Sequence, residues 1–201
     1  VLGINIAKAE NKKILYNVNI IQEALAKGVQ ISFDYMGWDK HKKLVKKYER
    51  RYNMNPWALI WANDRYYLYG YDVKKTGDVF VERNYRVDKL DNIQLSDVPR
   101  DGKTQYRSFN ANTYVSRRMG MFSGKEQAIT VRIPEYLIGA FIDQFGKRIT
   151  ISEESEDMLQ VTFYAVPSVI LLGWLAGLKV AEVVGPLDVR AVSYTHLTLP
   201  T

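Results

Sequence analysis

The chain has 201 residues, and its 47% hydrophobic and 25% charged fractions are those of an ordinary globular protein with room for one large or two small domains. The absence of cysteine excludes disulfides and cysteine-ligated metal sites. No apolar run approaches the roughly 20 residues that span a bilayer, so we expect a cytoplasmic protein without a membrane partner.

The formal net charge of +6 is a local feature. Seven lysines and arginines but only one acid lie within residues 40–51, so this segment carries the whole basic excess. Such a concentration of positive charge favours an anionic partner. The alternative is that the lysines of 40–47 form the solvated tip of a hairpin.

The first half of the chain predicts one helix followed by short strands. Residues 12–27 repeat apolar side chains at helical spacing, and Gly28 is placed to end that helix. About five strands joined by hairpins favour a small closed barrel over a sandwich. Alternation and aromatic or β-branched enrichment place these strands at 31–35, 50–54, 57–62, 65–71 and 79–89, with a polar arm at 36–47 and a turn at 74–78.

The strand at 65–71 is the most aromatic part of the chain. Since successive side chains of a strand alternate, Tyr67, Tyr69 and Tyr71 share one face, and Tyr66 and Leu68 share the other. A tyrosine offers a flat apolar ring and a polar tip. The simplest interpretation is therefore that these rings fill a barrel core and form hydrogen bonds at its rim.

The second half of the chain predicts a separate domain. Residues 97–103 are polar, contain Pro99 and Gly102, and form the clearest linker. Further on, the pattern predicts strand, helix, strand, strand, helix and strand in that order, the ferredoxin-like arrangement. The expected domains are a leading helix at 1–28, a barrel at 29–98, a connector at 99–125, a ferredoxin-like domain at 126–192 and a tail at 193–201.

The tail differs from the rest of the chain. Pro186 and Asp188 suit the start of one more helix. Residues 193–201, however, have no Lys, Arg, Asp or Glu and no helical period, and they contain a proline. We therefore expect that this helix does not develop, and we interpret the tail as non-native sequence.

Four segments resemble one known family. Tyr66-Tyr67-Leu68 is similar to the Trp-Tyr-Leu triplet that names the WYL domain of bacterial transcription regulators, with Tyr in the place of Trp. Residues 31–35 resemble its first strand, 55–60 its proline-started strand, and 85–90 its arginine-containing strand. The resemblance implies an α+β protein with a leading helix and a small Sm-like or SH3-like barrel. Residues 126–192 resemble the C-terminal extension domain that commonly follows WYL domains.

The same resemblance implies a regulator with a helix-turn-helix domain ahead of the barrel. Only about 28 residues precede the first strand, and they make one helix. We therefore expect that the helix-turn-helix domain is missing from this chain, that operator DNA is contacted only through it, and that the regulator is a homodimer.

The candidate ligand site combines aromatic and basic side chains. Small barrels commonly bind nucleic acid by stacking bases on rings beside a basic groove, and arginine binds phosphate bidentately. In the resemblance, Arg86 falls on the family's ligand-facing arginine, Tyr67 on the centre of the triplet, and Lys89 where many members have a second arginine. A salt bridge from Arg86 to Asp88 or Glu82 is the alternative. The candidate residues are Tyr35, Arg51, Tyr66, Tyr67, Tyr85, Arg86 and Lys89.

Catalytic chemistry has little support in the sequence. The chain has two histidines, His41 in the polar arm 36–47 and His196 in the tail, which are too few and too far apart in the sequence for a histidine triad or a zinc site. The glycine-punctuated segment 120–124 matches no phosphate-loop spacing. We expect no enzyme activity, no cofactor and no metal.

The sequence favours the effector-sensing region of a bacterial transcriptional regulator, with a nucleotide-like anion or short single-stranded DNA as effector. One alternative is a stand-alone Sm-like module that binds single-stranded nucleic acid, and another is an enzyme acting on a nucleotide. Sequence encoded upstream of Val1 would distinguish the first two interpretations.

Overall fold

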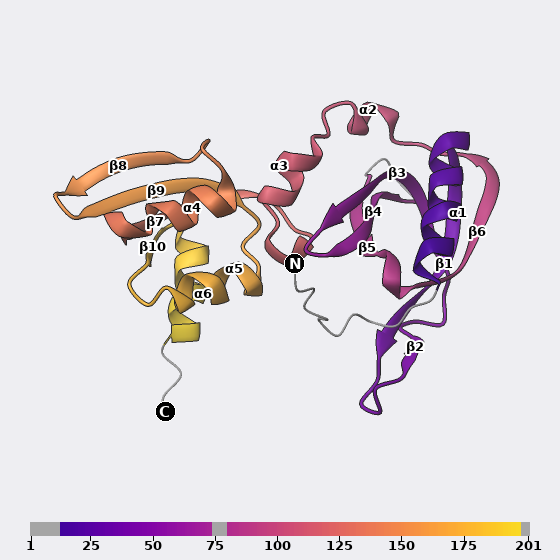
Figure 1. The fold of residues 1–201 in the computed structure, drawn as a ribbon, viewed down its shortest axis with the longest axis horizontal. Coiled ribbons are helices and arrows are strands. Elements are labelled where there is room, and N and C mark those ends of the chain that lie inside the picture. Colours follow the sequence, from indigo (N-terminus) through magenta and orange to yellow (C-terminus); the bar gives the residue numbers. More distant parts are fainter. Residues whose placement is uncertain (1–12, 74–79, 198–201) are drawn as a thin grey trace, which may run out of the picture. The chain divides into compact units, whose positions relative to one another are not determined.

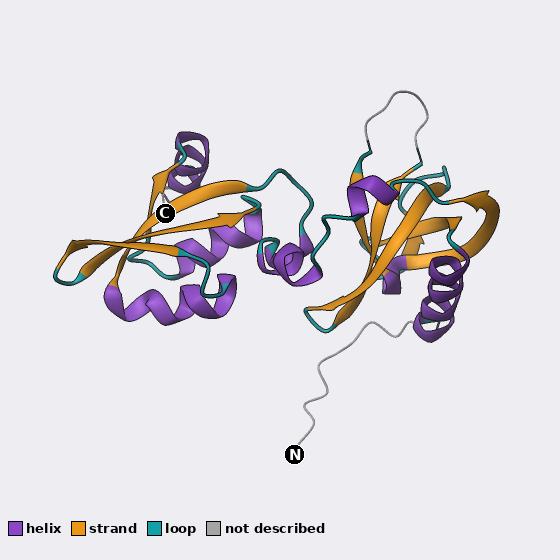
Figure 2. Cartoon of the chain, turned by 90° about the horizontal axis from the view of Figure 1, so that it is seen from above, coloured by secondary structure: helices purple, strands orange, loops and turns teal. Residues whose placement is uncertain are grey.

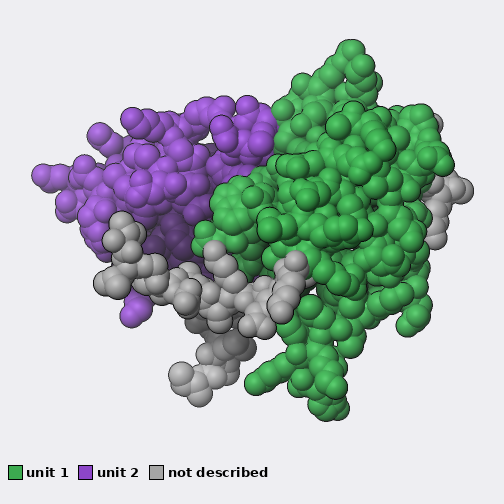
Figure 3. Space-filling model, turned by 45° about the vertical axis from the view of Figure 1, so that its right-hand side comes forward, with its two compact units in different colours: residues 1–109 green, residues 110–201 purple. Residues whose placement is uncertain are grey.

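The computed structural model describes residues 13–73 and 80–197. The chain divides into two compact units, Val1–Phe109 and Asn110–Thr201 (Figure 3), and the division falls within the expected connector 99–125. The predicted turn at 74–78 and the end of the predicted tail, 198–201, lie outside the described residues. No helix in the described part of the chain has the length and apolar character needed to cross a membrane.

Unit 1 packs helix α1 on a curled antiparallel sheet (Figure 1). The strand order is β2-β1-β3-β4-β5, and β6 pairs with the other side of β1. Together with unit 2, described below, this makes an α+β protein. The elements of unit 1 are α1 (Ile14–Lys27), β1 (Val29–Trp38), β2 (Leu44–Lys46), β3 (Tyr52–Ala62), β4 (Arg65–Asp72), β5 (Glu82–Arg86), the 3-10 turn η1 (Val87–Lys89), β6 (Leu90–Pro99) and α2 (Lys103–Tyr106).

Helix α1 forms for the reasons that its sequence predicts. Ile21 and Ala24 are fully buried in the core that α1 shares with the sheet. The helix ends where Gly28 adopts a left-handed φ of 67° and donates its N–H to Ala24 O. On the same buried face, Asn17 donates to Val87 O at 3.3 Å and Leu90 O at 2.8 Å. These bonds attach α1 directly to η1.

The strands differ from the prediction at three places. The expected polar arm 36–47 is a hairpin, formed by the end of β1 and by β2. The expected strands 50–54 and 57–62 are one strand, β3, which continues through an irregularity between Pro56 and Ala58. The expected strand 79–89 is instead β5, which ends at Arg86, and it is followed by η1 and the unpredicted strand β6. Two register shifts interrupt the pairing of β6 with β1. Such bulges break the two-residue alternation that reveals a strand in a sequence.

The segment expected to be the linker, 97–103, lies against the curled sheet of unit 1. Its first residues belong to β6, and Arg100 N–H then donates to Gly28 O at 2.8 Å. The Asp101 N–H donates to Asn55 Oδ1 at 2.9 Å, and Trp57 Nε1 donates to Asp101 O at 2.8 Å. Composition alone suggested a solvated segment, but its backbone polar groups are bonded to the sheet.

The residues that follow cover the outer tyrosine face of β4. Phe109 stacks on Tyr69 with ring centroids 4.1 Å apart, and Tyr106 stacks on Trp57 at 4.8 Å. The Tyr69 hydroxyl donates to Glu82 Oε2 at 3.0 Å. Tyr69 and Tyr71 are buried, at 1% and 4% exposed, but the expectation that these rings fill the barrel core is wrong, because the core shared with α1 takes Leu68 from the opposite face of β4.

Unit 2 contains a four-stranded antiparallel sheet in the order β10-β7-β9-β8, with helices packed against it (Figure 2). Phe141, Leu171 and Leu175 of its helices pack with Ile129, Val131 and Val161 of its strands. The elements are α3 (Ala111–Ser116), η2 (Met119–Met121), β7 (Gln127–Pro134), η3 (Glu135–Leu137), α4 (Ile138–Phe145), β8 (Thr150–Ser155), β9 (Met158–Ala165), α5 (Val169–Gly177), β10 (Glu182–Gly185) and α6 (Leu187–Leu197).

The expectation that the last helix does not develop is wrong. Helix α6 continues to Leu197, well into the predicted tail 193–201. Val189 is 3% exposed and belongs to the core of unit 2, and Ser193 is 8% exposed and donates to Arg190 O at 2.7 Å. The anchoring comes from the first turns of the helix, because packing can hold a helix whose own periodicity is weak.

Candidate functional site

An open pocket lies at the end of the unit 1 sheet from which the hairpin of β1 and β2 projects. Its volume is about 650 Å³, and the side chains around it are mainly tyrosines and cations. We call it the aromatic pocket. Its lining residues are Tyr35, Lys47, Tyr48, Arg50, Arg51, Tyr52, Asn53, Asp72, Val73, Arg83 and Tyr85.

Three strands supply the rings of the aromatic pocket. Tyr35 of β1, Tyr52 of β3 and Tyr85 of β5 contact one another edge to face, with centroids 5.2 Å apart for Tyr35–Tyr85, 5.9 Å for Tyr35–Tyr52 and 5.5 Å for Tyr52–Tyr85. Phe33, two residues before Tyr35, stacks on Tyr52 and meets the edge of Tyr85. The pocket floor is therefore an extension of the buried core, and its rings are held in place on several sides.

Two cations lie over the exposed rim of the pocket. The Arg50 guanidinium is 5.9 Å from the Tyr48 ring centroid and 5.6 Å from that of Tyr52. The Lys47 ammonium is 5.7 Å from the Tyr48 ring. Tyr48 is 53% exposed, so one face of this arrangement is open to a ligand.

The carboxylate of Asp72 is hydrogen-bonded to two other residues that line the pocket. It accepts a hydrogen bond from Arg83 Nε at 3.0 Å and another from the Tyr85 hydroxyl at 3.2 Å. Burial raises the pKa of Tyr85, and the charge of Asp72 and this hydrogen bond raise it further. Tyr85 is therefore a neutral donor at physiological pH, and Arg83 offsets the one acid that lines the pocket.

Arg51 lies beside the pocket, but its guanidinium is occupied on the other side of β1. It donates to Ser32 Oγ at 3.0 Å and to Asn92 O at 2.8 Å, and it lies 3.8 Å from Asp34 Oδ2. Lys46 also approaches Asp34 Oδ2, at 3.2 Å. The structure thus places Arg51 in an ion cluster behind β1, and Arg50 is the guanidinium that lies over the rings.

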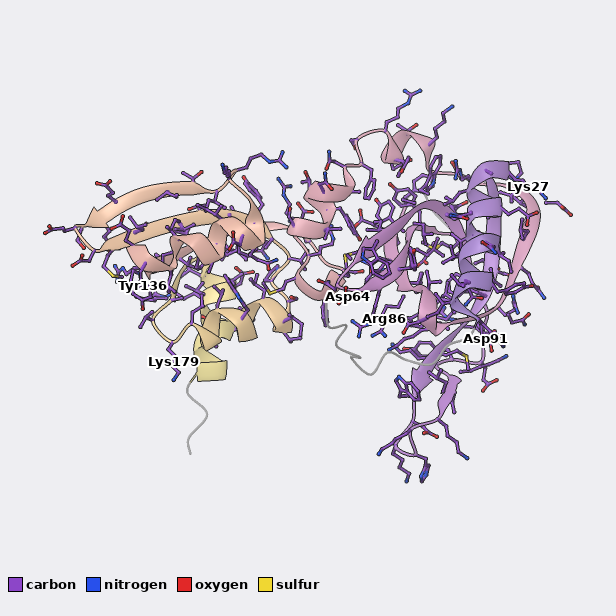
Figure 4. All side chains as sticks on the ribbon, viewed as in Figure 1. Lys27, Asp64, Arg86, Asp91, Tyr136 and Lys179 are labelled. Carbon is purple, nitrogen blue, oxygen red and sulfur yellow. The ribbon has the colours of Figure 1, made fainter. Side chains whose placement is uncertain are left out.

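Arg86 is the last residue of β5 and lies directly before the 3-10 turn η1 (Figure 4). It donates from Nε to Asp88 Oδ1 at 3.0 Å and from an Nη to Asp88 Oδ2 at 2.6 Å. The salt bridge to Asp88, the alternative considered for this arginine, is therefore present. Across the β4–β5 pairing Arg86 lies opposite Tyr67, which is 5% exposed.

The Arg86 turn and the aromatic pocket meet at Tyr35. Burial raises the pKa of Tyr35, against the effect of a hydrogen bond from the Arg86 backbone and of the Arg86 charge. Burial lowers the pKa of Lys89, and the charge of Arg86 lowers it further. The charges of Lys47 and Arg65 act on Lys89 in the same direction, and Asp88 opposes them. Positive charge is therefore concentrated beside this turn.

Residues 16–95 match the WYL domain family. The chain contains a WYL domain. Among solved structures, the chain resembles proteasome accessory factor B/C (PafBC) of Arthrobacter aurescens, with 14% identity, a TM-score of 0.40, and 98% of this chain and 28% of that chain covered. It also resembles a structure described as a CRISPR Cas-related protein, with 15% identity, a TM-score of 0.59, and 94% of this chain and 53% of that chain covered.

The chain spans about half, or less, of the length of these two proteins. At such low identity the likeness to the CRISPR Cas-related protein shows a shared fold and nothing about activity. No curated protein sequence matches the chain. Within the described residues there is no group of three or more histidine, aspartate or glutamate side chains that could hold a metal ion.

The structure divides the seven candidate residues of the WYL domain into three places. Tyr35, Tyr85 and Arg51 line the aromatic pocket, although the Arg51 guanidinium is occupied elsewhere. Arg86 and Lys89 lie at the start and end of the neighbouring η1 turn, and Tyr67 of β4 pairs with Arg86. Tyr66 packs against the core and meets the Trp61 ring edge to face at 4.7 Å, apart from both.

Sequence reasoning missed Lys47, Tyr48, Arg50, Tyr52 and Arg83 as members of the WYL domain pocket. A signal for most of them was present. In the segment 47–52, tyrosines lie on both sides of an arginine pair, next to the end of the basic arm. Interleaved rings and cations of this kind are typical of surfaces that bind single-stranded nucleic acid.

Proposed function

We propose that this chain is the effector-sensing region of a cytoplasmic bacterial transcriptional regulator, and that its effector is a nucleotide-like anion or short single-stranded DNA bound in the aromatic pocket. The observation that carries this proposal is the position of Arg50 and Lys47 over the exposed ring of Tyr48, at the mouth of a pocket floored by tyrosines. The WYL domain match is consistent with a regulatory sensor.

The two kinds of side chain suit the two parts of a nucleotide. An aromatic ring holds a base by stacking, with about 1–3 kcal/mol lost per ring when it is replaced by alanine. Arginine and lysine bind phosphate through charge-assisted hydrogen bonds, which arginine can make in pairs. Tyr48 with Tyr52 can therefore receive a base, while Arg50 and Lys47 receive a phosphate. The pocket binds its ligand without changing it chemically.

Arg86 adds a second phosphate contact in this proposal. Its guanidinium is bound to Asp88. When a phosphate binds, the guanidinium therefore exchanges the Asp88 carboxylate for the phosphate as its anionic partner. Tyr35 lies between this turn and the pocket rings, which makes the two places continuous.

We further infer that unit 1 is an Sm-like barrel and unit 2 a ferredoxin-like extension domain, supported by the strand orders of the two sheets. In the intact regulator, a helix-turn-helix domain outside this chain contacts operator DNA, and the regulator acts as a homodimer.

The test of the pocket is a binding titration of 5′-phosphorylated hexathymidine at several salt concentrations. Arg50→Ala should weaken binding and lower the slope of log affinity against log salt by about 0.7, the contribution of one phosphate contact to a single strand. Tyr48→Ala should weaken binding by about 1–3 kcal/mol and leave the slope unchanged. Both side chains are exposed, so neither substitution threatens the fold.

Arg107→Ala and Tyr16→Ala are the matched controls, because both replace the same residue type at exposed positions outside the pocket. They should bind as the unaltered chain does. If Arg50→Ala and Tyr48→Ala also bind as the unaltered chain does, the aromatic pocket is not the site.

The affinity should also depend on pH through Lys89. Burial and the charge of Arg86 lower the pKa of this lysine in the free protein, and a bound phosphate favours its charged form. The contribution of Lys89 to affinity is therefore complete below its free pKa and is lost as pH rises through its higher, bound-state pKa. Titrations between pH 7 and 10 should show a decline that Lys89→Ala removes. Lys27→Ala, which alters an exposed lysine of α1, should keep that decline.

A further inference from the structure

The hairpin formed by β1 and β2 has two different faces, which its register defines. Met36 pairs with Lys46, Gly37 with Val45, and Trp38 with Leu44. The same register continues on both sides, because Lys47 N–H donates to Tyr35 O and Asp39 N–H donates to Lys43 O. Since directly paired residues share a face, one face carries Tyr35, Lys47, Gly37, Val45, Asp39 and Lys43.

This face, which we call the track face, continues out of the aromatic pocket. Its inner pair, Tyr35 and Lys47, already lines the pocket. Figure 1 shows the hairpin projecting from the rest of the unit 1 sheet, so the track face leads away from the pocket to the hairpin tip. Lys43 and Lys47 lie four residues apart along one strand segment, about 13 Å at the usual rise.

Between these two lysines, the β1 side of the track face has no projecting side chain. Gly37 has no side chain, and a Cβ placed there would come no closer than 4.0 Å to the Cβ of Lys47. The Asp39 carboxylate at the tip is occupied, because it accepts the backbone N–H groups of His41 and Lys43 at 2.9 Å and 2.8 Å. The opposite face differs, since it carries Trp38 and Leu44 and its Lys46 is paired with Asp34.

We propose that the track face binds the sugar-phosphate backbone of a single strand of several nucleotides, one nucleotide of which occupies the aromatic pocket. Lys47 and Lys43 contact successive parts of this backbone, and Gly37 leaves room for it to lie close to the hairpin. This inference rests on the proposed function of the pocket. It selects an oligonucleotide over a free mononucleotide as the ligand, because a mononucleotide fills the pocket and leaves the lysine at the tip unused.

The experiment compares thymidine 5′-monophosphate with 5′-phosphorylated hexathymidine in binding titrations. The unaltered chain should bind the hexamer more tightly than the monomer. The hexamer should also show a steeper salt dependence, by about 0.7 in slope for the phosphate contact that Lys43 adds. Val45→Glu places a negative charge on the track face and should weaken hexamer binding about fivefold, as expected when roughly one such contact, that of Lys43, is lost. It should leave monomer binding nearly unchanged.

Leu44→Glu is the matched control, because it adds the same charge to the adjacent residue on the opposite face of the hairpin. Both side chains are exposed, at 37% for Leu44 and 43% for Val45. Leu44→Glu should weaken hexamer binding much less than Val45→Glu. Equal losses from the two substitutions would mean that the hairpin attracts polyanions without a track, and would overturn the inference.

Two further outcomes separate this inference from the function on which it rests. Tight monomer binding that does not increase with length would overturn the track face and leave the pocket as a mononucleotide site. Failure of both the monomer and the hexamer to bind would overturn the proposed function itself.

Discussion

Replacement of Gly70 by alanine should destabilise unit 1 by about 3 kcal/mol or more, which is roughly 12 °C in the unfolding midpoint of a unit of this size. A Cβ at this position would clash with the backbone oxygen of Asn55 and lie 3.0 Å from Met54 Cε. Gly70 pairs with Pro56, next to the irregularity in β3, where the two strands approach closely. The clash is with backbone, so β3 and β4 must separate to relieve it.

Gly37→Ala is the control for this substitution, because it adds the same methyl group to another strand glycine of unit 1 with ordinary van der Waals space around it. It should leave the midpoint unchanged or raise it slightly. Calorimetry of the full chain measures both variants. A Gly70→Ala midpoint within about 2 °C of the unaltered chain, less than the effect of 1 kcal/mol, would show that the close approach of β3 and β4 does not exist in solution.

Replacement of Phe141 by alanine should destabilise unit 2 by about 3–5 kcal/mol, the usual cost of removing a buried phenylalanine. Phe141 is fully buried, and its ring lies 5.1 Å from Trp174, 5.7 Å from Phe163 and 6.1 Å from Phe145. The substitution leaves a cavity between α4, α5 and β9. Since domains are stable by only about 5–15 kcal/mol, this loss is a large fraction of the total.

Tyr136→Ala controls for the loss of an aromatic ring in the same unit, because Tyr136 is 75% exposed. It should change the free energy of unfolding by less than about 0.5 kcal/mol. Urea titrations followed by circular dichroism measure both variants. Similar losses for the two variants, or none for Phe141→Ala, would contradict the position of Phe141 at the centre of the unit 2 core.

The sequence predicts an element best where one side of it is buried in a regular way. Ile31 and Phe33 in β1 alternate with the polar Ser32 and Asp34, and this strand is found where the pattern places it. Strand β6 escapes the same reasoning, because its bulged pairing with β1 puts Leu90 and Ile93 in the core three residues apart. A period of two is invisible in such a strand.

The candidate site was harder to predict because it depends on register. Arg50 and Arg51 are neighbours, and composition cannot tell which of them faces a ligand. In the structure the guanidinium of Arg50 lies over the pocket rings, while that of Arg51 lies behind β1 with Ser32 and Asn92. A shift of one residue changes the face of a strand, so the choice between them needs the strand pairing. The pairing of Arg86 with Asp88 is local and was within reach of the sequence.

The bonds from Asn17 to the carbonyls of Val87 and Leu90 set a lower limit on the segment that can hold the site. These two carbonyls flank Asp88 and Lys89, and their hydrogen bonds to Asn17 are buried beneath α1. A shortened protein that starts at β1 would remove the Asn17 amide from both carbonyls, leaving Val87 O with the Leu90 N–H, and would expose the apolar surface that Ile21 and Ala24 cover. The smallest part of unit 1 that we expect to fold on its own therefore begins with α1, because a fragment made of the sheet strands alone would lose the support of the turn that follows Arg86.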